Sequence, residues 1–287
     1  MSSIELTAPA KVNLVLKVFN KRKDGYHNLL TLFERISLSD LVTVSMAPSG
    51  ISITCDRAVV KRAKDNIAYK AAELILKTAR VGAGVRIDIR KRIPVAAGLG
   101  GGSSDAAATL IGINRLFNIN MGKAGLMRLG AKLGADVPFF IFDTPFAVGR
   151  GIGDRLKKAD LRVKLYHLLI YPGFKVATKD VYKALDLGLT MRRGGDKITL
   201  PKDWSGFEGI VHNDLEDIII IKRPVIGKVI QCLVSSLGRK AMVSGSGPSV
   251  FCLYRTRREA VRARDKLFSS VPARLRRNWQ VFIVETV

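Results

Sequence analysis

The chain has 287 residues, of which 47% are hydrophobic and 25% charged, a composition typical of a globular protein with one large or two smaller cores. Its 48 Lys and Arg residues outnumber its 24 Asp and Glu residues, so the formal net charge is +24. This composition excludes a disordered or fibrous chain. No apolar run reaches the ~20 residues that a membrane span requires. The positive charge favours anionic ligands.

The sequence lacks the features of a secreted protein. Its first residues, MSSIELTAPAK, do not show the basic and then apolar segments of a signal peptide, and the cysteines at positions 55, 232 and 252 form no CxxC pair. We therefore expect a protein of the reducing cytoplasm without a membrane partner.

The first half of the chain predicts strands followed by helices. Residues 3–46 are mostly extended, with a turn at residues 23–25. Beyond them, hydrophobic periodicity predicts a helix, a strand and two further helices, the last ending at Gly134. These elements are expected over residues 67–75, 85–90, 105–117 and 121–133.

The second half continues the mixture, which predicts an α+β fold. Apolar runs and helical spacing predict a strand, a helix, a strand, a helix and a last strand. These are expected over residues 165–171, 224–237, 250–254, 258–268 and 280–284, with a loop at 191–203 and a turn of small residues at 241–247.

Residues 94–104, with the sequence PVAAGLGGGSS, are the most informative segment. Its glycines remove side chains where a backbone must approach a ligand, and two serines bring hydroxyl groups to the start of the helix that follows. Because a helix N-terminus favours an anion, the segment predicts a phosphate site, with a glycine turn that binds nothing as the alternative. It fits neither the GxxxxGK[ST] nor the GxGxxG template.

Continued to residue 107, this segment resembles the phosphate-binding motif of the GHMP kinases. APAKVNL at residues 8–14 and VSGSGPS at residues 243–249 resemble two other motifs of that family in the same order, so the resemblance covers nearly the whole chain. It implies an ATP-dependent kinase with a two-domain fold. We expect residues 1–160 to hold the phosphate loop and the catalytic base, and residues 161–287 to contribute to substrate binding.

The resemblance makes ATP the expected cofactor. The positions that it assigns to ATP are Pro94, Ala96, Ala97, Gly98, Leu99, Gly100, Gly101, Gly102, Ser103, Ser104 and Asn66. Asn66 also precedes a helix that it can cap, and both roles are compatible. We expect Mg²⁺ to arrive with ATP and no protein metal site, since the histidines and cysteines lack metal-ligand spacing. Asp105 is not assigned to the metal, because an acid in the first helical turn explains it equally well.

Phosphoryl transfer needs a group that takes the hydroxyl proton and a positive charge near the attacking oxygen. The GADVP segment of the family implies that Asp136 is the base, and the AKVN segment implies that Lys11 lies beside it. Without the resemblance, Asp136 would be interpreted as a turn carboxylate and Lys11 as a solvated lysine.

Segments DGYHNL and HNDLE resemble one branch of the family, whose acceptor is a cytidine-diphosphate sugar alcohol of non-mevalonate isoprenoid biosynthesis. The resemblance implies that two tyrosines stack on the cytosine ring while a histidine meets its edge. A tyrosine packed in a turn and a surface histidine are the alternative. The residues assigned to the substrate are Asn13, Tyr26, His27, Thr178 and Tyr182.

Two other functions compete with this interpretation. The first is a GHMP kinase that acts on homoserine or mevalonate. These substrates contain no nucleobase on which Tyr26 and His27 could stack. An RNA-binding module is supported by the charge and by the arginine-rich residues 255–277, but aromatic content is only 7% and no RRM or KH signature occurs. We therefore expect ATP and a small-molecule substrate as partners, no specific nucleic acid, and a monomer or weak homodimer.

Overall fold

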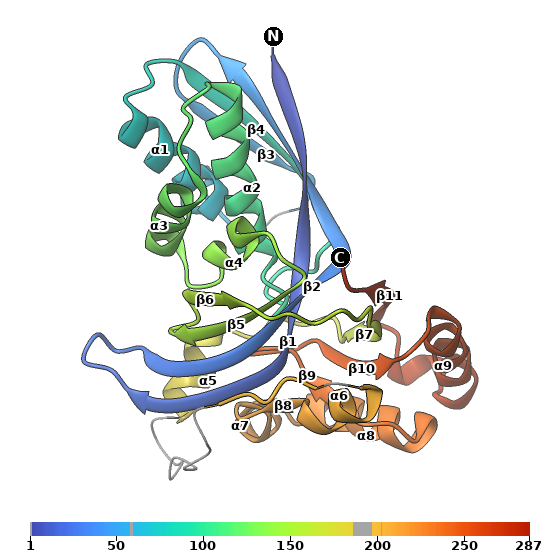
Figure 1. Cartoon of the computed structure of the whole chain (residues 1–287). Helices are drawn as coiled ribbons and strands as arrows, with labels where there is room; N and C mark the ends of the chain where they lie inside the picture. The colour runs from blue at the N-terminus through green and yellow to red at the C-terminus, as the bar shows by residue number, and fades with distance from the viewer. Residues whose placement is uncertain (1, 58–59, 186–196, 202) are drawn as a thin grey trace. The chain divides into compact units, whose positions relative to one another are not determined.

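The computed structural model describes residues 2–57, 60–185, 197–201 and 203–287 (Figure 1). It divides into two compact units, each of which combines segments that are distant in sequence. Unit 1 comprises Met1–Ala10, Leu38–Val95 and Gly100–Thr144, and unit 2 comprises Lys11–Ser37, Ala96–Leu99 and Pro145–Val287. The long strands β1 (Ser3–Lys21) and β2 (His27–Ala47) contribute residues to both units.

In unit 1, the second half of β2 pairs in antiparallel fashion with β4 (Gly84–Arg90), which pairs in parallel with β3 (Ile51–Cys55). Four helices accompany these strands, and Figure 1 shows them grouped together. They are α1 (Ile67–Ala79), α2 (Gly101–Leu116), α3 (Lys123–Leu133) and α4 (Val137–Phe142), and a short 3₁₀ turn, η1 (Ala63–Asp65), precedes α1. The small apolar face of α1, with three buried alanines, allows it to pack closely against α2.

In unit 2, the first half of β2 pairs with β5 (Phe146–Gly151), β5 pairs with β6 (Arg155–Lys158), and β1 pairs in parallel with β8 (His212–Asn213). A second, antiparallel sheet has the strand order β11-β7-β10-β9. Its members are β11 (Gln280–Glu285), β7 (Tyr166–Tyr171), β10 (Val250–Tyr254) and β9 (Ala241–Val243).

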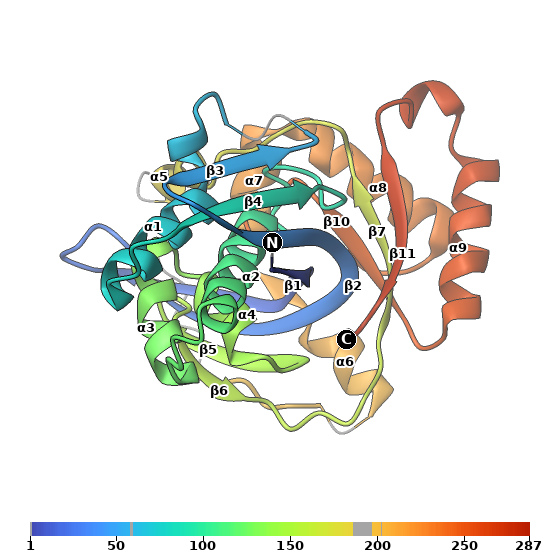
Figure 2. The ribbon, with the colours of Figure 1, turned by 90° about the horizontal axis from the view of Figure 1, so that it is seen from above.

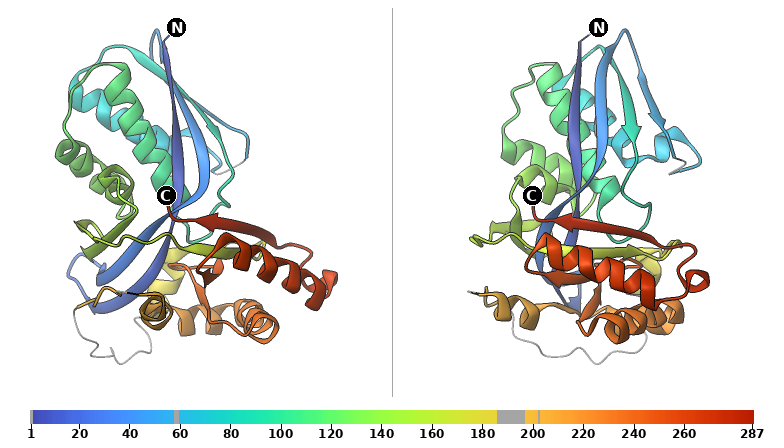
Figure 3. Two further views of the ribbon diagram at one scale, coloured as in Figure 1. Left: turned by 45° about the vertical axis from the view of Figure 1, so that its right-hand side comes forward. Right: turned by 90° about the vertical axis from the view of Figure 1, so that its right-hand side faces the viewer.

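Helices α8 (Pro224–Leu237) and α9 (Arg257–Ser270) lie along one face of this second sheet (Figures 2 and 3). Alternate strand residues, such as Leu168, Ile170 and Cys252, form a core with the apolar faces of the two helices. The remaining elements of unit 2 are α5 (Thr178–Leu185), α6 (Trp204–Ile210), α7 (Glu216–Lys222) and η2 (Ala273–Leu275).

The α+β prediction is confirmed, and so are most of the predicted elements. The helix predicted over residues 105–117 is correct in type, but it begins four residues earlier, at Gly101. Glycine is tolerated there because the first N–H groups of a helix have no acceptor within the helix. The turn predicted at residues 241–247 is wrong in its first three residues, which form β9 because they pair with β10.

The loop predicted at residues 191–203 lies mostly outside the described residues. The three cysteines are free thiols. Within the described chain, no helix combines the length and the apolar character that a membrane span requires.

Candidate active site

The backbone of residues 94–104, the glycine loop, enters the left-handed region at three alternate residues. The φ angle is 55° at Ala96, 77° at Gly98 and 70° at Gly100, values that residues with a β-carbon adopt at a steric cost. At Gly98 a side chain is also excluded by its surroundings, since a β-carbon would lie 2.3 Å from the carbonyl oxygen of Ser244. The loop therefore requires glycine at this position for both backbone angle and space.

The first turn of α2 offers an anion-binding surface. Gly100 precedes the helix, and the N–H of Ser104 donates to the Gly100 carbonyl at 2.9 Å. The N–H groups of Gly101, Gly102 and Ser103 precede this bond, so they have no acceptor within the helix. The Ser104 hydroxyl is buried and, in the part of the chain that the structure describes, has no hydrogen-bond partner. This donor set fits the phosphate groups of a nucleotide.

The three motifs that resemble the GHMP kinases meet within unit 2. The Ser244 hydroxyl donates to the carbonyl of Gly98 at 3.1 Å. On the other side, the N–H of Lys11 donates to the carbonyl of Leu99 at 3.0 Å. The glycine loop is thus held between β1 and the turn that follows β9.

Lys11 is a buried lysine, which contradicts the alternative of a solvated surface residue. Its Nζ donates to Asn13 Oδ1 at 2.6 Å and lies 5.7 Å from the centroid of the Phe33 ring. The backbone of Gly245 lies close to this contact, because a β-carbon there would be 3.3 Å from Lys11 Nζ. Asn13 was assigned to the substrate, and the structure shows in addition that it binds Lys11.

Asp136, the predicted base, lies in unit 1 at the start of α4. It occupies the N-cap position, and Pro138 follows two residues later in the first helical turn. The half-buried Asp136 side chain makes no capping bond to the helix that it precedes. Its carboxylate therefore does not serve the usual structural role of an aspartate at this position.

Asn66 caps α1, as one of its two predicted roles requires. Its Oδ1 accepts a hydrogen bond from the N–H of Ala68 at 2.9 Å, and its side chain is buried. The cap occupies Oδ1 of Asn66 and does not involve its amide nitrogen.

Among the residues assigned to the substrate, His27 and Tyr182 lie together in unit 2. Their ring centroids are 5.6 Å apart and their planes differ by 32°. His27 is buried, whereas Tyr26 is 58% exposed, so the alternative of a packed tyrosine and a surface histidine is the reverse of what the structure shows. Thr178 lies at the start of α5, one turn before Tyr182, and its hydroxyl is 2.8 Å from the Ser246 hydroxyl.

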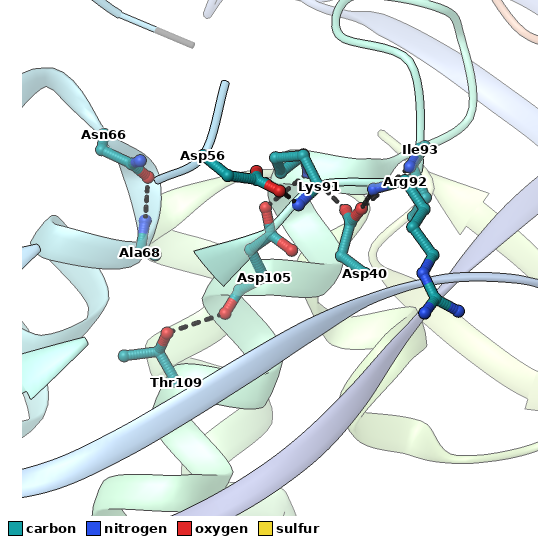
Figure 4. Close-up of polar contacts among 9 residues, drawn as sticks. All are labelled: Asp40, Asp56, Asn66, Ala68, Lys91, Arg92, Ile93, Asp105 and Thr109. Atoms are coloured by element: carbon teal, nitrogen blue, oxygen red, sulfur yellow. Dashed lines mark hydrogen bonds and ion pairs between the residues drawn. The ribbon is translucent and has the colours of Figure 1, made fainter. Parts of the chain in front are cut away.

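A buried ionic cluster next to α2 has no counterpart in the sequence predictions (Figure 4). Lys91 Nζ donates to Asp105 at 2.7 Å and also to Asp40, whose other oxygen accepts the N–H groups of Arg92 and Ile93. All three charged side chains are buried. Asp105 lies beyond the first turn of α2, so it is not the first-turn acid considered above.

The pKa of Asp105 is raised to about 7, chiefly by burial and in addition by the charge of Asp40, against the lowering effect of Lys91. Burial lowers the pKa of Lys91, but the two carboxylates outweigh it and the net pKa is raised. The cluster was missed because its members are 14 and 51 residues apart and follow no spacing rule. Its position matters for the site, since Lys91 Nζ lies 3.4 Å from where a β-carbon of Gly101 would be.

Among the described residues, no three His, Cys, Asp or Glu side chains come together in a way that could hold a metal ion.

Comparison with known families gives two matches along the chain. Residues 66–144 match the GHMP kinases N terminal domain, and residues 197–273 match the GHMP kinases C terminal domain. The first match contains the glycine loop, Asn66 and Asp136, and the second contains the turn that follows β9.

Full-length relatives are similar at high identity. The 4-diphosphocytidyl-2-C-methyl-D-erythritol kinase of Syntrophus aciditrophicus is 40% identical over 284 residues, which cover 99% of both chains. The enzyme of the same name from Pelobacter propionicus is 44% identical over 271 residues, covering 93% of this chain and 95% of the relative.

Solved structures agree with these relatives. A crystal structure of 4-(cytidine 5'-diphospho)-2C-methyl-D-erythritol kinase matches with a TM-score of 0.72 and 34% identity, covering 98% of this chain and 99% of the other. A homoserine kinase from Cytophaga hutchinsonii matches with a TM-score of 0.73 at 20% identity, covering 100% of this chain and 95% of the other, which indicates a shared fold.

Proposed function

Because the chain belongs to the GHMP kinases, and among them to the 4-diphosphocytidyl-2-C-methyl-D-erythritol kinases, we propose that its glycine loop, Lys11 and Asp136 carry out phosphoryl transfer from ATP. The function is phosphorylation of the 2-hydroxyl of 4-diphosphocytidyl-2-C-methyl-D-erythritol, in non-mevalonate isoprenoid biosynthesis. The observation that carries the residue assignment is the meeting of the glycine loop, Lys11 and the Ser244 turn in unit 2.

Phosphate binding rests on backbone groups. The N–H groups at the start of α2 bind the phosphates, and the absence of side chains at Gly101 and Gly102 permits a close approach. Ser104 supports this role, because its buried hydroxyl lacks a partner in the described chain and a phosphate oxygen supplies one. The amide of Asn66, anchored as the cap of α1, contributes to the adenine side.

Acceptor activation rests on two charged groups carried over from the family motifs. Asp136 takes the proton of the 2-hydroxyl, a role that is compatible with the absence of a capping bond from its side chain to α4. Lys11 stabilises negative charge on the attacking oxygen. Asn13, Tyr26, His27, Thr178 and Tyr182 bind the cytidine-diphosphate alcohol.

Mg²⁺ arrives with ATP in this proposal. When bound, it neutralises charge on the β- and γ-phosphates, as in other kinases. Asp105 is engaged by Lys91 and is not assigned to the metal.

One assay tests the proposal against its nearest alternatives. The protein is incubated with Mg·ATP and, separately, with the cytidine-diphosphate alcohol, homoserine and mevalonate, and ADP formation is followed. We expect rapid turnover with the first compound. Preference for homoserine or mevalonate would leave the fold intact and overturn the substrate assignment.

Three further expectations belong to the proposal. A functional division near residue 160, a cytoplasmic location and a monomer or weak homodimer remain predictions. Size-exclusion chromatography with light scattering tests the last of them, and a stable higher oligomer would contradict it.

A further inference from the structure

A buried chain of hydrogen bonds leads from Lys11 to the backbone of β1 through two side chains. Lys11 Nζ donates to Asn13 Oδ1 at 2.6 Å, and Asn13 Nδ2 donates to Thr31 Oγ1 at 2.8 Å. The Thr31 hydroxyl in turn donates to the carbonyl of Val15 at 2.7 Å. Lys11 and Asn13 are at most 4% exposed and Thr31 is completely buried, so solvent does not compete for these bonds.

The direction of each bond in this chain follows from the atoms involved. A hydroxyl has a single hydrogen, which Thr31 gives to Val15, so Thr31 offers Asn13 a lone pair. Only the NH₂ end of the Asn13 amide can donate to that lone pair, and the carbonyl end must then face Lys11. A flipped amide would place its NH₂ group against an ammonium and its oxygen against the hydroxyl lone pair.

We propose that Thr31 is a positioning residue for phosphoryl transfer, because it fixes the amide orientation of Asn13 that holds Lys11 Nζ in place. The inference rests on the proposed function, which puts Lys11 at the acceptor oxygen. A lysine side chain has a flexible four-carbon stem, so a fixed acceptor lowers the entropy that is lost when the ammonium is placed. Asn13 keeps one Nδ2 hydrogen, which makes a substrate contact compatible with this role.

The surroundings confine the Lys11–Asn13 contact from two sides. A β-carbon on Gly245 would lie 3.1 Å from Asn13 Oδ1 and 3.3 Å from Lys11 Nζ, so the backbone there packs directly on the contact. The ring of Phe33, two residues from Thr31 on β2, lies 5.7 Å from Lys11 Nζ. These neighbours limit the positions open to Nζ, and the Asn13 oxygen selects one of them.

Two substitutions at position 31 separate the hydroxyl from the shape of the side chain. Thr31→Val keeps the shape and removes the acceptor, so we expect kcat to fall by roughly 10- to 100-fold, the cost of a misplaced catalytic group. KM for ATP should change less than about twofold, because the residues assigned to ATP are not held by the hydrogen bonds between Lys11, Asn13 and Thr31. Thr31→Ser keeps the hydroxyl and should retain kcat within about threefold.

Thr109→Val is the matched control. Thr109 is also a completely buried threonine whose hydroxyl donates to a backbone carbonyl, that of Asp105 at 2.8 Å. Among the described residues, no side chain donates to its hydroxyl. We expect Thr109→Val to keep kcat, so that loss of a buried hydroxyl alone does not explain the effect at position 31.

A wild-type kcat in Thr31→Val, or a Thr31→Ser enzyme as slow as the valine variant, would overturn the inference.

Failure of the proposed function can be told apart from failure of this inference, since the wild-type protein would then not phosphorylate the cytidine-diphosphate alcohol. In that case a crystal structure of Thr31→Val still decides: we expect a rotated Asn13 amide and a displaced Lys11 Nζ, and unchanged positions would contradict the inference. If the valine variant does not fold, hydrogen exchange of the Asn13 side-chain amide in the wild-type protein replaces it, and exchange of both hydrogens at the rate of an exposed asparagine would overturn the inference.

Discussion

Gly98 and Ser244 meet backbone to backbone although 146 residues separate them, and a β-carbon on Gly98 would lie 2.3 Å from the Ser244 carbonyl oxygen. The Ser244 hydroxyl adds a hydrogen bond to the Gly98 carbonyl. The close approach fixes the glycine loop against the turn after β9, so the shape of the loop depends on both segments.

Gly98→Ala should therefore damage both stability and activity. Its φ of 77° costs a residue with a β-carbon about 1–2 kcal/mol, and the Ser244 turn must move in addition. We expect urea unfolding to show a loss of at least that size, together with a lower kcat. Gly82→Ala is the control, since a β-carbon there meets nothing within 4 Å, and equal losses in both variants would contradict the explanation.

The buried Asp105 carboxyl makes stability depend on pH. Burial raises its pKa from 3.8 to about 7, whereas an aspartate in the unfolded chain ionises near pH 4. Between these values the folded protein holds a proton that the unfolded chain has lost. The contribution of Asp105 to the free energy of unfolding is therefore fully present below about pH 4, falls as the pH rises to about 7, and stays lost above it.

Asp105→Asn isolates this effect because the amide does not titrate. We expect the free energy of unfolding of the wild type, measured relative to the variant in urea, to fall as the pH rises from 5 to about 7 and to stay level from there to pH 8. Asp88→Asn is the contrasting control. Burial raises the pKa of Asp88, but the hydrogen bonds from Arg86 and Thr54 lower it by more than this, so the net pKa lies below 3.8. The stability that Asp88 contributes is lost only toward acid pH. The difference in free energy of unfolding between the wild type and Asp88→Asn should therefore be flat over the same range.

The glycine loop, Lys11 and the Ser244 turn could be singled out in the sequence because each lies in a segment that resembles a motif of the GHMP kinases. Regular helices and strands were predictable from hydrophobic periodicity, as α8 shows, whose bounds are those expected. Thr31 and Lys91 were not predictable. Each is a single polar residue in or next to a strand, and its role arises from partners that only folding brings near.

Asp136→Asn tests the proposed base. The substitution keeps the size of the side chain and removes its ability to take a proton, so kcat should fall by roughly 10²- to 10⁴-fold while ATP affinity changes little. ADP release and ATP titration measure the two quantities. Asp160→Asn, at an exposed position, should leave both unchanged, and near-normal turnover of the Asp136 variant would eliminate the assigned role.

The rings assigned to cytidine can be tested one at a time. Tyr182 lies against the buried His27, and the neighbouring Tyr26 is exposed. Stacking of a base on an aromatic ring contributes about 1–3 kcal/mol, or roughly tenfold or more in affinity. Tyr26→Ala and Tyr182→Ala should each raise KM for the cytidine-diphosphate alcohol by about this factor and leave KM for ATP nearly unchanged. Phenylalanine at either position should retain most of the affinity, since the ring face makes the contact.

The edge of the base is tested through His27, whose imidazole can bond the positions at which cytosine and uracil differ. His27→Ala should reduce the preference for the cytidine substrate over a uridine analogue, measured as the ratio of their kcat/KM values. It also removes the ring on which Tyr182 packs, so the affinity for both substrates should fall in parallel with Tyr182→Ala. Tyr182→Ala provides the comparison, because it disturbs the same packing without removing the imidazole and should keep more of the base preference. An unaltered cytidine preference in His27→Ala, or an equal rise in KM for ATP in the tyrosine variants, would make this ring pair a structural feature of unit 2 and not a base-binding site.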